Sequence, residues 1–344
     1  MGNIEFLSCE TVMTTEIPEV KYCVDTLIGP GLYIIAGEPK IGKSKLALDL
    51  CLNVAVGGTV LGLQTAKGCV LYYDLEDPLY RVQNRLFEQI ADPVDNVYFS
   101  LSAGYIGNGL EESIEQFYQE HRDLRLVVID TLQKVRENEE SSYGTDYKEL
   151  SSVKDVADRL GITIIVIHHT RKQRDTSPFK TIAGTTGLRG VADGNIVLVW
   201  TNEDQQLAML YAEGRDVPRR KMEIQFDIAT QRWKLIADDL KEPEKFDDEV
   251  VTAIVSVMKE LNTFNESATV LTERVNKITK KDYAPKVVSR IMTQNKTRLE
   301  KLGVLFERRH SNGKRKLSII YVENNSKGDD GADGDDIISP APEQ

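Results

Sequence analysis

The stretch "YIIAGEPKIGKSKLALDL", residues 33–50, decides the fold of this chain. It begins as an apolar, β-branched run typical of a buried strand, passes through a polar turn and continues in a helical pattern. The turn, Gly37 to Ser44, matches the pattern G-x-x-x-x-G-K-[ST] at every position. Because a strand, a glycine-rich turn and a helix follow one another in this order, we expect a phosphate-binding loop (P-loop).

The residue types of this loop fit a nucleoside triphosphate and its metal ion. Glycines let backbone N–H groups turn toward phosphates, and the start of the helix adds partial positive charge. We expect Lys43 to reach the β- and γ-phosphates and the Ser44 hydroxyl to hold Mg²⁺. The predicted ligands are therefore ATP and Mg²⁺. The predicted nucleotide-binding residues are Gly37, Glu38, Pro39, Lys40, Ile41, Gly42, Lys43, Ser44, Lys45 and Asp130, with Ser44 and Asp130 on the metal.

Strand and helix patterns alternate over the first two thirds of the chain. Continuous apolar strands separated by amphipathic helices indicate an α/β fold with a mostly parallel sheet covered on both faces. The strand patterns are residues 32–37, 68–76, 124–130, 162–169 and 195–200, and the helical patterns are 43–56, 79–90, 111–121 and 147–160. Three further strand patterns, 207–214, 222–228 and 231–238, follow without helices, so we expect them to be antiparallel.

Composition divides the chain into five parts. Residues 1–30 form an irregular lead-in, and residues 31–237 form the P-loop domain. Residues 238–247 are polar and charged and predict a linker. Residues 248–324 contain three helical patterns and two strands around a Ser-Asn-Gly turn, the layout of a small winged-helix domain. Residues 325–344 are acidic and poor in aromatics, which predicts a disordered tail.

Length and composition are those of a soluble globular protein, with 344 residues, 41% hydrophobic and 28% charged. No apolar run is long enough to cross a membrane, and the start lacks the pattern of a secretory signal. The four cysteines, Cys9, Cys23, Cys51 and Cys69, show no metal spacing and are expected to be reduced thiols. These features predict a cytoplasmic protein with no membrane partner.

The net charge of −11 conceals a strong local asymmetry. Between residues 271 and 321 there are 14 Lys and Arg against 4 Asp and Glu. A basic segment of this kind is typical of nucleic-acid contact, although it can also be a solvated face.

A second chemical signal lies at the ends of two other strands. The 124–130 strand ends in Asp130, where a carboxylate can bind Mg²⁺ opposite Ser44. Many P-loop ATPases place a catalytic Glu directly after this Asp, but here the next residue is Thr131. Glu76, at the carboxyl end of the 68–76 strand, is our candidate for the group that activates water. Asp74 and Asp77 are alternatives for this role.

A base on a neighbouring strand is the arrangement of the RecA/DnaB class. Over roughly residues 20–236 the chain resembles this class, and within it the RepA-type hexameric helicases of plasmids, phages and other mobile elements. The resemblance rests on the order and spacing of "AGEPKIGKS", "YYDLEDP…R…RL", "VVIDTL", "IIVIHHTRK" and "GTTGLRGVADGNIVLVW" followed by "AEGRDVP". It implies a RecA-like core that hydrolyses ATP between subunits of a homo-oligomer, with a hexamer favoured.

The resemblance also implies roles for three more residues. His168, at the end of the 162–169 strand, matches a His that contacts the γ-phosphate region, although His169 is an alternative. Arg189 matches an arginine finger inserted into the neighbouring subunit's nucleotide site. Arg215 matches a second basic residue that faces the same neighbour. A surface ion pair is the alternative interpretation of both arginines.

Two long loops are candidates for contact with single-stranded DNA. In the RecA class, the loops at these positions grip DNA mainly through its phosphates. The loop after His169 contains Arg171, Lys172 and Lys180, with Phe179 as a speculative stacking residue. The loop after Asp130 carries several glutamates, which makes it a poor electrostatic partner for DNA.

The C-terminal segment predicts a second DNA contact, with double-stranded DNA. Residues 284–303 would form a recognition helix and residues 308–316 the wing. The candidate DNA-binding residues are Lys286, Arg290, Lys296, Arg309, Lys314 and Arg315. Protein docking is the alternative role for such a domain.

Together these features predict an ATP-dependent DNA-acting motor, a replicative helicase or replication protein of the RepA type. The alternative is a RecA-like ATPase without unwinding activity, namely a recombination mediator, a helicase loader or an ATP-switched DNA-binding regulator.

Overall fold

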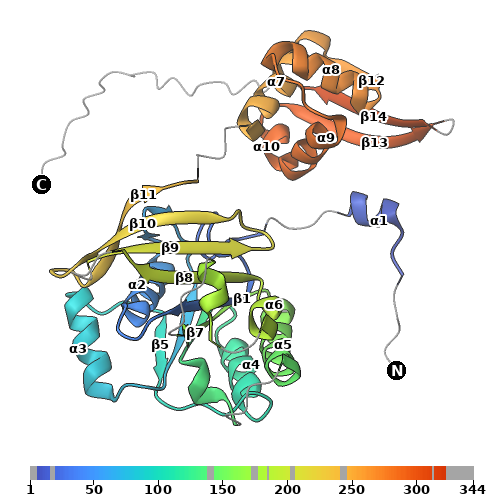
Figure 1. Cartoon of the computed structure of the whole chain (residues 1–344). Helices are drawn as coiled ribbons and strands as arrows, with labels where there is room; N and C mark the ends of the chain where they lie inside the picture. Colours follow the sequence, from blue (N-terminus) through green and yellow to red (C-terminus); the bar gives the residue numbers. More distant parts are fainter. Residues whose placement is uncertain are drawn as a thin grey trace, which may run out of the picture. The chain divides into compact units, whose positions relative to one another are not determined.

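A nine-stranded sheet organises the N-terminal two thirds of the chain (Figure 1). The structure is a computed structural model that describes residues 6–15, 20–137, 143–171, 177–183, 186–201, 206–240, 246–311 and 314–322. The chain divides into two compact units, residues 1–241 and 242–344, and each is described by itself.

The sheet of the first unit has the order β11-β10-β9-β8-β1-β7-β6-β4-β5. Six neighbouring strands, from β8 to β5, are parallel, and β9, β10 and β11 continue the sheet in antiparallel fashion. The strands are β1 (Gly31–Gly37), β4 (Cys69–Asp74), β5 (Val97–Ser100), β6 (Leu124–Asp130), β7 (Thr163–His169), β8 (Gly194–Trp200), β9 (Leu207–Gly214), β10 (Arg220–Asp227) and β11 (Arg232–Asp238). The predicted α/β class with a mostly parallel sheet is confirmed.

Both faces of the sheet are buried, as the continuous apolar strands require. All seven residues of β1 are buried. One core cluster joins one sheet face to α2 (Lys43–Val56), and the other joins the opposite face to α4 (Leu110–Glu120), α5 (Tyr143–Leu160) and α6 (Thr186–Val191). Figure 1 shows these last three helices grouped together (green). The helix α3 (Leu79–Gln89) is more peripheral, with Val82 its one fully buried residue.

The short elements are those that the sequence patterns do not predict. The edge strand β5 has only four residues and is half-buried, so it lacks the long apolar run of its neighbours. The others in this unit are α1 (Cys9–Thr14), β2 (Thr59–Val60), β3 (Leu63–Gln64), and the 3₁₀ turns η1 (Leu132–Val135) and η2 (Pro178–Thr181).

The second unit packs four helices against a three-stranded antiparallel sheet of order β12-β14-β13. Its elements are α7 (Phe246–Leu261), β12 (Thr263–Glu266), α8 (Ala268–Thr279), α9 (Pro285–Gln294), α10 (Lys296–Lys301), β13 (Val304–Ser311) and β14 (Lys314–Tyr321). The third helical pattern, expected to be one helix, is divided at Asn295, whose Nδ2 donates to the carbonyl oxygen of Ile291 (3.0 Å). A side chain that binds its own helix in this way competes with the backbone and favours a break.

Within the described ranges, none of the helices is both long and apolar enough to cross a membrane. The predicted tail, residues 325–344, and most of the predicted linker lie outside the described residues.

Candidate nucleotide site

The P-loop lies at the carboxyl end of β1 and leads into α2. Gly42, which directly precedes α2, has a φ of 87°, a conformation that L side chains rarely adopt. A Cβ at Gly42 would also lie 3.1 Å from Nε1 of Trp233. The same Nε1 donates to the carbonyl oxygen of Gly42 (3.3 Å). This position therefore requires glycine, and Trp233 of β11 supports the loop.

Lys43 begins α2, and its ammonium group lies inside the loop. Its Nζ donates to the carbonyl oxygens of Gly37 (3.0 Å) and Glu38 (2.9 Å). Burial lowers the pKa of Lys43, while the carboxylates of Asp130 and Glu76 act in the opposite direction. Since the first turn of α2 contains no acidic residue, the helix start and Lys43 together favour an anion.

Asp130 ends β6 close to the start of α2. Ser44, the second residue of α2, hydrogen-bonds the carboxylate of Asp130, and the Tyr72 hydroxyl donates to its Oδ2 (2.9 Å). Burial raises the pKa of Asp130 despite these two hydrogen bonds. A hydroxyl and a carboxylate are the protein ligands that Mg²⁺ accepts when phosphate oxygens complete its shell. Ser44 and Asp130 thus fit the ion predicted from the sequence.

Glu76 lies in the turn after β4, one strand away from Asp130 in the sheet. The Thr131 hydroxyl donates to Oε1 of Glu76 (3.1 Å). Glu76 is exposed, whereas Asp74 and Asp77 are buried and ion-paired with Arg85. Among the three acids weighed for water activation, Glu76 is therefore the one with a carboxylate accessible to solvent beside the metal site.

The two histidines at the end of β7 point to opposite faces of the sheet. His168 Nε2 hydrogen-bonds the carbonyl oxygen of Ala183 (3.0 Å), and burial lowers the pKa of His168 to about 4. His169 Nδ1 lies 3.5 Å from Nζ of Lys43. Burial, followed by the charge of Lys43, lowers the pKa of His169. His169, the alternative at the sequence level, is thus the histidine that lies next to the P-loop.

Arg189 of α6 and Arg215 after β9 lie at the other end of the sheet. Arg189 Nε is 3.6 Å from Glu213 Oε1, and Arg215 NH1 is 3.3 Å from Asp193 Oδ1. Asp193 also accepts from the backbone N–H of Leu32, at the start of β1. Leu32 lies five positions before Gly37, the first residue of the P-loop, which is roughly 16 Å at strand spacing. Arg215 is therefore remote from the P-loop of its own subunit. Arg189 is held on β9, two strands away from β1, because its partner Glu213 belongs to that strand.

The loop after β7 is closed at its base by backbone contacts. The Arg171 N–H donates to the carbonyl oxygen of Thr181 (2.7 Å), and the side chains of Arg171 and Lys180 are exposed. Lys172 lies outside the described residues. Phe179 is only 2% exposed and has the Arg219 guanidinium 5.5 Å from its ring centroid. The stacking role suggested for Phe179 is not supported, because the ring is buried.

In the second unit, Lys286 and Arg290 are exposed and lie one turn apart on α9. Lys296 begins α10 and is half-buried. The side chains of Arg309, Lys314 and Arg315 lie outside what the structure describes.

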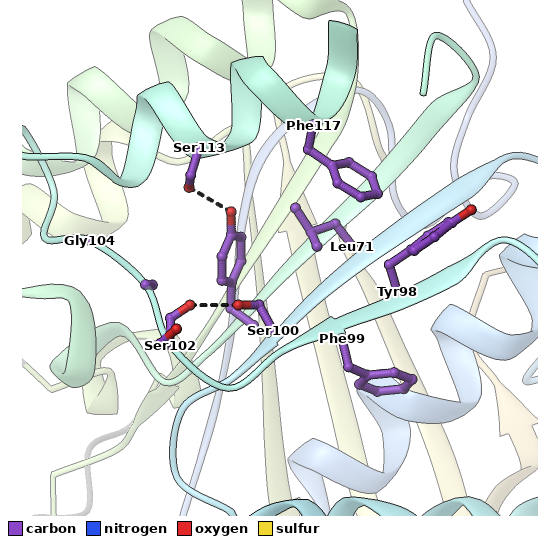
Figure 2. A pocket seen from close by; sticks show the side chains of 10 residues that line it. Leu71, Tyr98, Phe99, Ser100, Ser102, Gly104, Ser113 and Phe117 are labelled. Carbon is purple, nitrogen blue, oxygen red and sulfur yellow. Dashed lines mark hydrogen bonds between the residues drawn. The ribbon is translucent and has the colours of Figure 1, made fainter. Parts of the chain in front are cut away.

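A separate open pocket of about 440 Å³ lies between β4, β5 and α4 (Figure 2). Figure 2 shows Tyr98, Phe99 and Phe117 around it, and the Ser100 hydroxyl donating to the carbonyl oxygen of Ser102 (2.7 Å). None of the P-loop residues lines this pocket.

The fold and the nucleotide site define a class, the P-loop nucleoside triphosphatases with a RecA-like core. Residues 4–175 match the family model AAA_25, described as "AAA domain". The match spans half of the chain, and the chain belongs to this family.

One solved structure shares the fold at a TM-score of 0.50, and a second is less similar. The chain is similar to a solved structure described as an "ATPase Domain", with a TM-score of 0.50 and 17% identity over 60% of this chain and 85% of that one. It is also similar to a chain from "The Structure Of A DnaB-Like Replicative Helicase And Its Interactions With Primase", with a TM-score of 0.47 and 18% identity. That match covers 60% of this chain and 59% of the helicase chain. The first of these likenesses shows the fold of an ATPase domain, and together with the family match it supports the resemblance to the DnaB/RecA class found in the sequence.

Three residues of the site were given no role from the sequence, namely Trp233, and Tyr72 and Arg85, which lie within the quoted motif "YYDLEDP…R…RL". Trp233 is 191 positions from Gly42, which it contacts, so no local signal predicts the pair. The proximity of His169 to Lys43 could have been read from the alternation of β7, since His169 shares its face with Ile165 and Ile167 of the α2 core cluster.

Proposed function

We propose that this protein is an ATP-dependent DNA-acting motor, a replicative helicase or replication protein of the RepA type. It would hydrolyse ATP at the interfaces of a homo-oligomer, with a hexamer favoured. The observation that carries the proposal is the hydrogen bond from Thr131 to Glu76 beside Ser44 and Asp130. It supports a hydrolytic site of the RecA/DnaB arrangement.

The residues of one subunit would act on bound ATP in distinct ways. The P-loop N–H groups and Lys43 would hold the phosphates, so that Lys43 exchanges its carbonyl partners for phosphate oxygens. Ser44 and Asp130 would hold Mg²⁺, which, when bound, neutralises charge on the β- and γ-phosphates. Glu76 would accept a proton from the attacking water at the oxygen not bound by Thr131.

The neighbouring subunit would complete the site. Arg189 of α6 is ion-paired with Glu213 of β9, two strands away from β1, and not with the P-loop of its own subunit, which supports a role in trans. Arg215 lies at the same end of the sheet, held to Asp193, and would support the same interface. ATP hydrolysis would then depend on assembly.

DNA would be bound at two places. Arg171 and Lys180, exposed near the base of the loop after β7, would contact the phosphates of single-stranded DNA. The helices and antiparallel sheet of the second unit support its assignment as a winged-helix domain at residues 248–324. Lys286 and Arg290 would contact duplex phosphates there. The AAA_25 match ends at residue 175, so this unit lies beyond it.

The second unit also favours an alternative, a RecA-like ATPase that does not unwind DNA. Exposed basic residues one turn apart on α9 suit duplex recognition by a recombination mediator, a helicase loader or an ATP-switched regulator.

ATP turnover with and without single-stranded DNA, together with a strand-displacement assay, separates these functions. The helicase proposal predicts stimulated turnover and displacement of the annealed strand. Stimulated turnover without displacement would favour the mediator or loader. Negligible turnover with intact ATP binding would favour the switch.

A further inference from the structure

Arg85 of α3 lies between the two acids that flank Glu76. Its NH1 is 3.6 Å from Oδ2 of Asp74, and its NH2 is ion-paired with Oδ2 of Asp77. The backbone N–H of Asp77 also donates to Oδ1 of Asp74 (3.2 Å). The turn that presents Glu76 is thus closed by its own hydrogen bond, and the Arg85 guanidinium is the group that binds both of its flanking acids.

The burial of these charges makes the guanidinium important. The side chains of Asp74 and Asp77 are only 4% and 5% exposed, and that of Arg85 is 24% exposed. Buried carboxylates require a charged partner, and the planar fork of Arg can serve two at once. Within the described ranges, Arg85 is the one cation ion-paired with Asp74. Asp74 also lies opposite Asp130 in the sheet, so its charge would otherwise be opposed by a second carboxylate.

The other end of α3 is fixed to the P-loop helix. Gln89, one turn after Arg85, donates through Nε2 to the carbonyl oxygens of Lys45 (3.2 Å) and Gln231 (3.1 Å). Glu88 is ion-paired with Lys45 (2.7 Å). Because Lys45 directly follows Ser44, α3 connects the turn of Glu76 to the residue that would hold Mg²⁺.

We propose that Arg85 is a positioning residue, which holds the Glu76 turn against the nucleotide site by binding Asp74 and Asp77 together. The proposal rests on the proposed function of Glu76 as the group that activates water. Arg85 does not contact the reacting atoms. Through α3 it sets the distance from Glu76 to the residues that would hold Mg²⁺. Thr131, which directly follows β6, binds the carboxylate of Glu76 from the other side.

Steady-state ATP turnover of the full chain tests this role through the separation of kcat from KM. Arg85→Gln should lower kcat about 10- to 100-fold, the usual result of a misplaced catalytic group, with ATP affinity largely kept. Arg85→Lys keeps the positive charge but lacks the planar guanidinium, so its kcat should lie between those of wild type and Arg85→Gln. This second variant keeps the test valid if Arg85→Gln folds poorly.

Arg81→Gln is the matched control. Arg81 lies one turn before Arg85 on α3 and also pairs with Asp77 (2.5 Å), but its side chain is 51% exposed. Because the Arg81 guanidinium is half exposed and does not reach Asp74, this variant should change kcat by less than about twofold.

A double-mutant cycle with Glu76→Gln, measured in single turnover, gives the sharpest result. If Arg85 acts through Glu76, Arg85→Gln should strongly slow hydrolysis by the wild-type protein. The same substitution should hardly slow hydrolysis by the Glu76→Gln protein, which has already lost the proposed base. The proposal is overturned if Arg85→Gln alone keeps the wild-type kcat. It is also overturned if Arg85→Gln slows the Glu76→Gln protein by the same factor as it slows wild type. Wild-type turnover by Glu76→Gln itself would remove the proposed base, and the proposal with it.

Discussion

The hydroxyl of Thr131 donates to the carboxylate of Glu76 at 3.1 Å. Thr131 occupies the position at which many P-loop ATPases have their catalytic Glu, and here it binds the Glu of the neighbouring strand instead. The two residues are 55 positions apart in the sequence and meet because β4 and β6 are adjacent in the sheet. The residue after Asp130 thus contributes to the site as a hydrogen-bond donor.

Removal of this donor should slow hydrolysis without weakening ATP binding. Thr131→Val keeps the shape of the buried side chain but leaves Glu76 without its partner, so we expect kcat to fall about tenfold. Thr131→Ser retains the hydroxyl and is the control. Steady-state kinetics over a range of ATP concentrations measure both kcat and KM for ATP. A wild-type kcat for Thr131→Val would show that the hydrogen bond does not position Glu76.

Gly42→Ala should weaken both the fold and ATP binding. A left-handed backbone costs a non-glycine residue about 1–2 kcal/mol, and the added methyl group meets Trp233. Gly161→Ala is the matched control, because Gly161 also has a positive φ (65°) but no atom lies within 4 Å of its Cβ position. It should lose a similar free energy of unfolding while keeping ATP affinity.

Urea unfolding measured by tryptophan fluorescence suits this comparison, since both tryptophans, Trp200 and Trp233, lie in the first unit. Equal affinities of the two glycine variants for a fluorescent ATP analogue would contradict the role of Gly42.

The stability of the first unit should depend on the protonation of His168. Its pKa is about 4 in the fold against 6.5 in the unfolded chain, so the unfolded chain binds more protons between these values. The contribution of His168 is therefore lost as the pH falls from 6.5 to 4. Asp49 and Asp74, with pKa values raised by burial to about 6, act in the opposite direction over a similar range.

Comparison of wild type with His168→Gln isolates the contribution of His168 to stability, because Asp49 and Asp74 are present in both proteins. The stability of wild type relative to the variant should fall by on the order of 3 kcal/mol between pH 7 and pH 4. Urea titrations at several pH values provide the measurement. Parallel pH profiles for the two proteins would refute the assignment.

Arg189→Ala should abolish turnover in assembled protein, by roughly three orders of magnitude if Arg189 is an arginine finger. Mixed with Lys43→Ala, which lacks a working P-loop but keeps its arginines, it should recover part of the activity, because each variant supplies what the other lacks. Arg159→Ala, which removes an exposed arginine paired with Glu115, is the control. Wild-type turnover by an Arg189→Ala protein that still oligomerises would exclude the finger.

The sequence was sufficient for the features that depend on local pattern. The P-loop, the strand that ends in Asp130 and the antiparallel strands after Trp200 all have apolar runs with clear ends, so their places could be predicted. The short edge strand β5 could not, because it is four residues long and half-buried.

The contacts that complete the site depend on the order of strands in the sheet. Tyr72 meets Asp130 only because β4 lies beside β6, and Arg85 meets Asp74 only because α3 folds back over the turn after β4. The break of the third C-terminal helix at Asn295 likewise depends on a side-chain hydrogen bond that helix periodicity does not reveal.

Single-turnover ATP hydrolysis by Glu76→Gln, at ATP concentrations that saturate both proteins, tests the central claim most directly. The account predicts that ATP binding persists while hydrolysis slows by about a hundredfold or more, the usual contribution of a general base. Hydrolysis at the wild-type rate by a Glu76→Gln protein that binds ATP normally would contradict it.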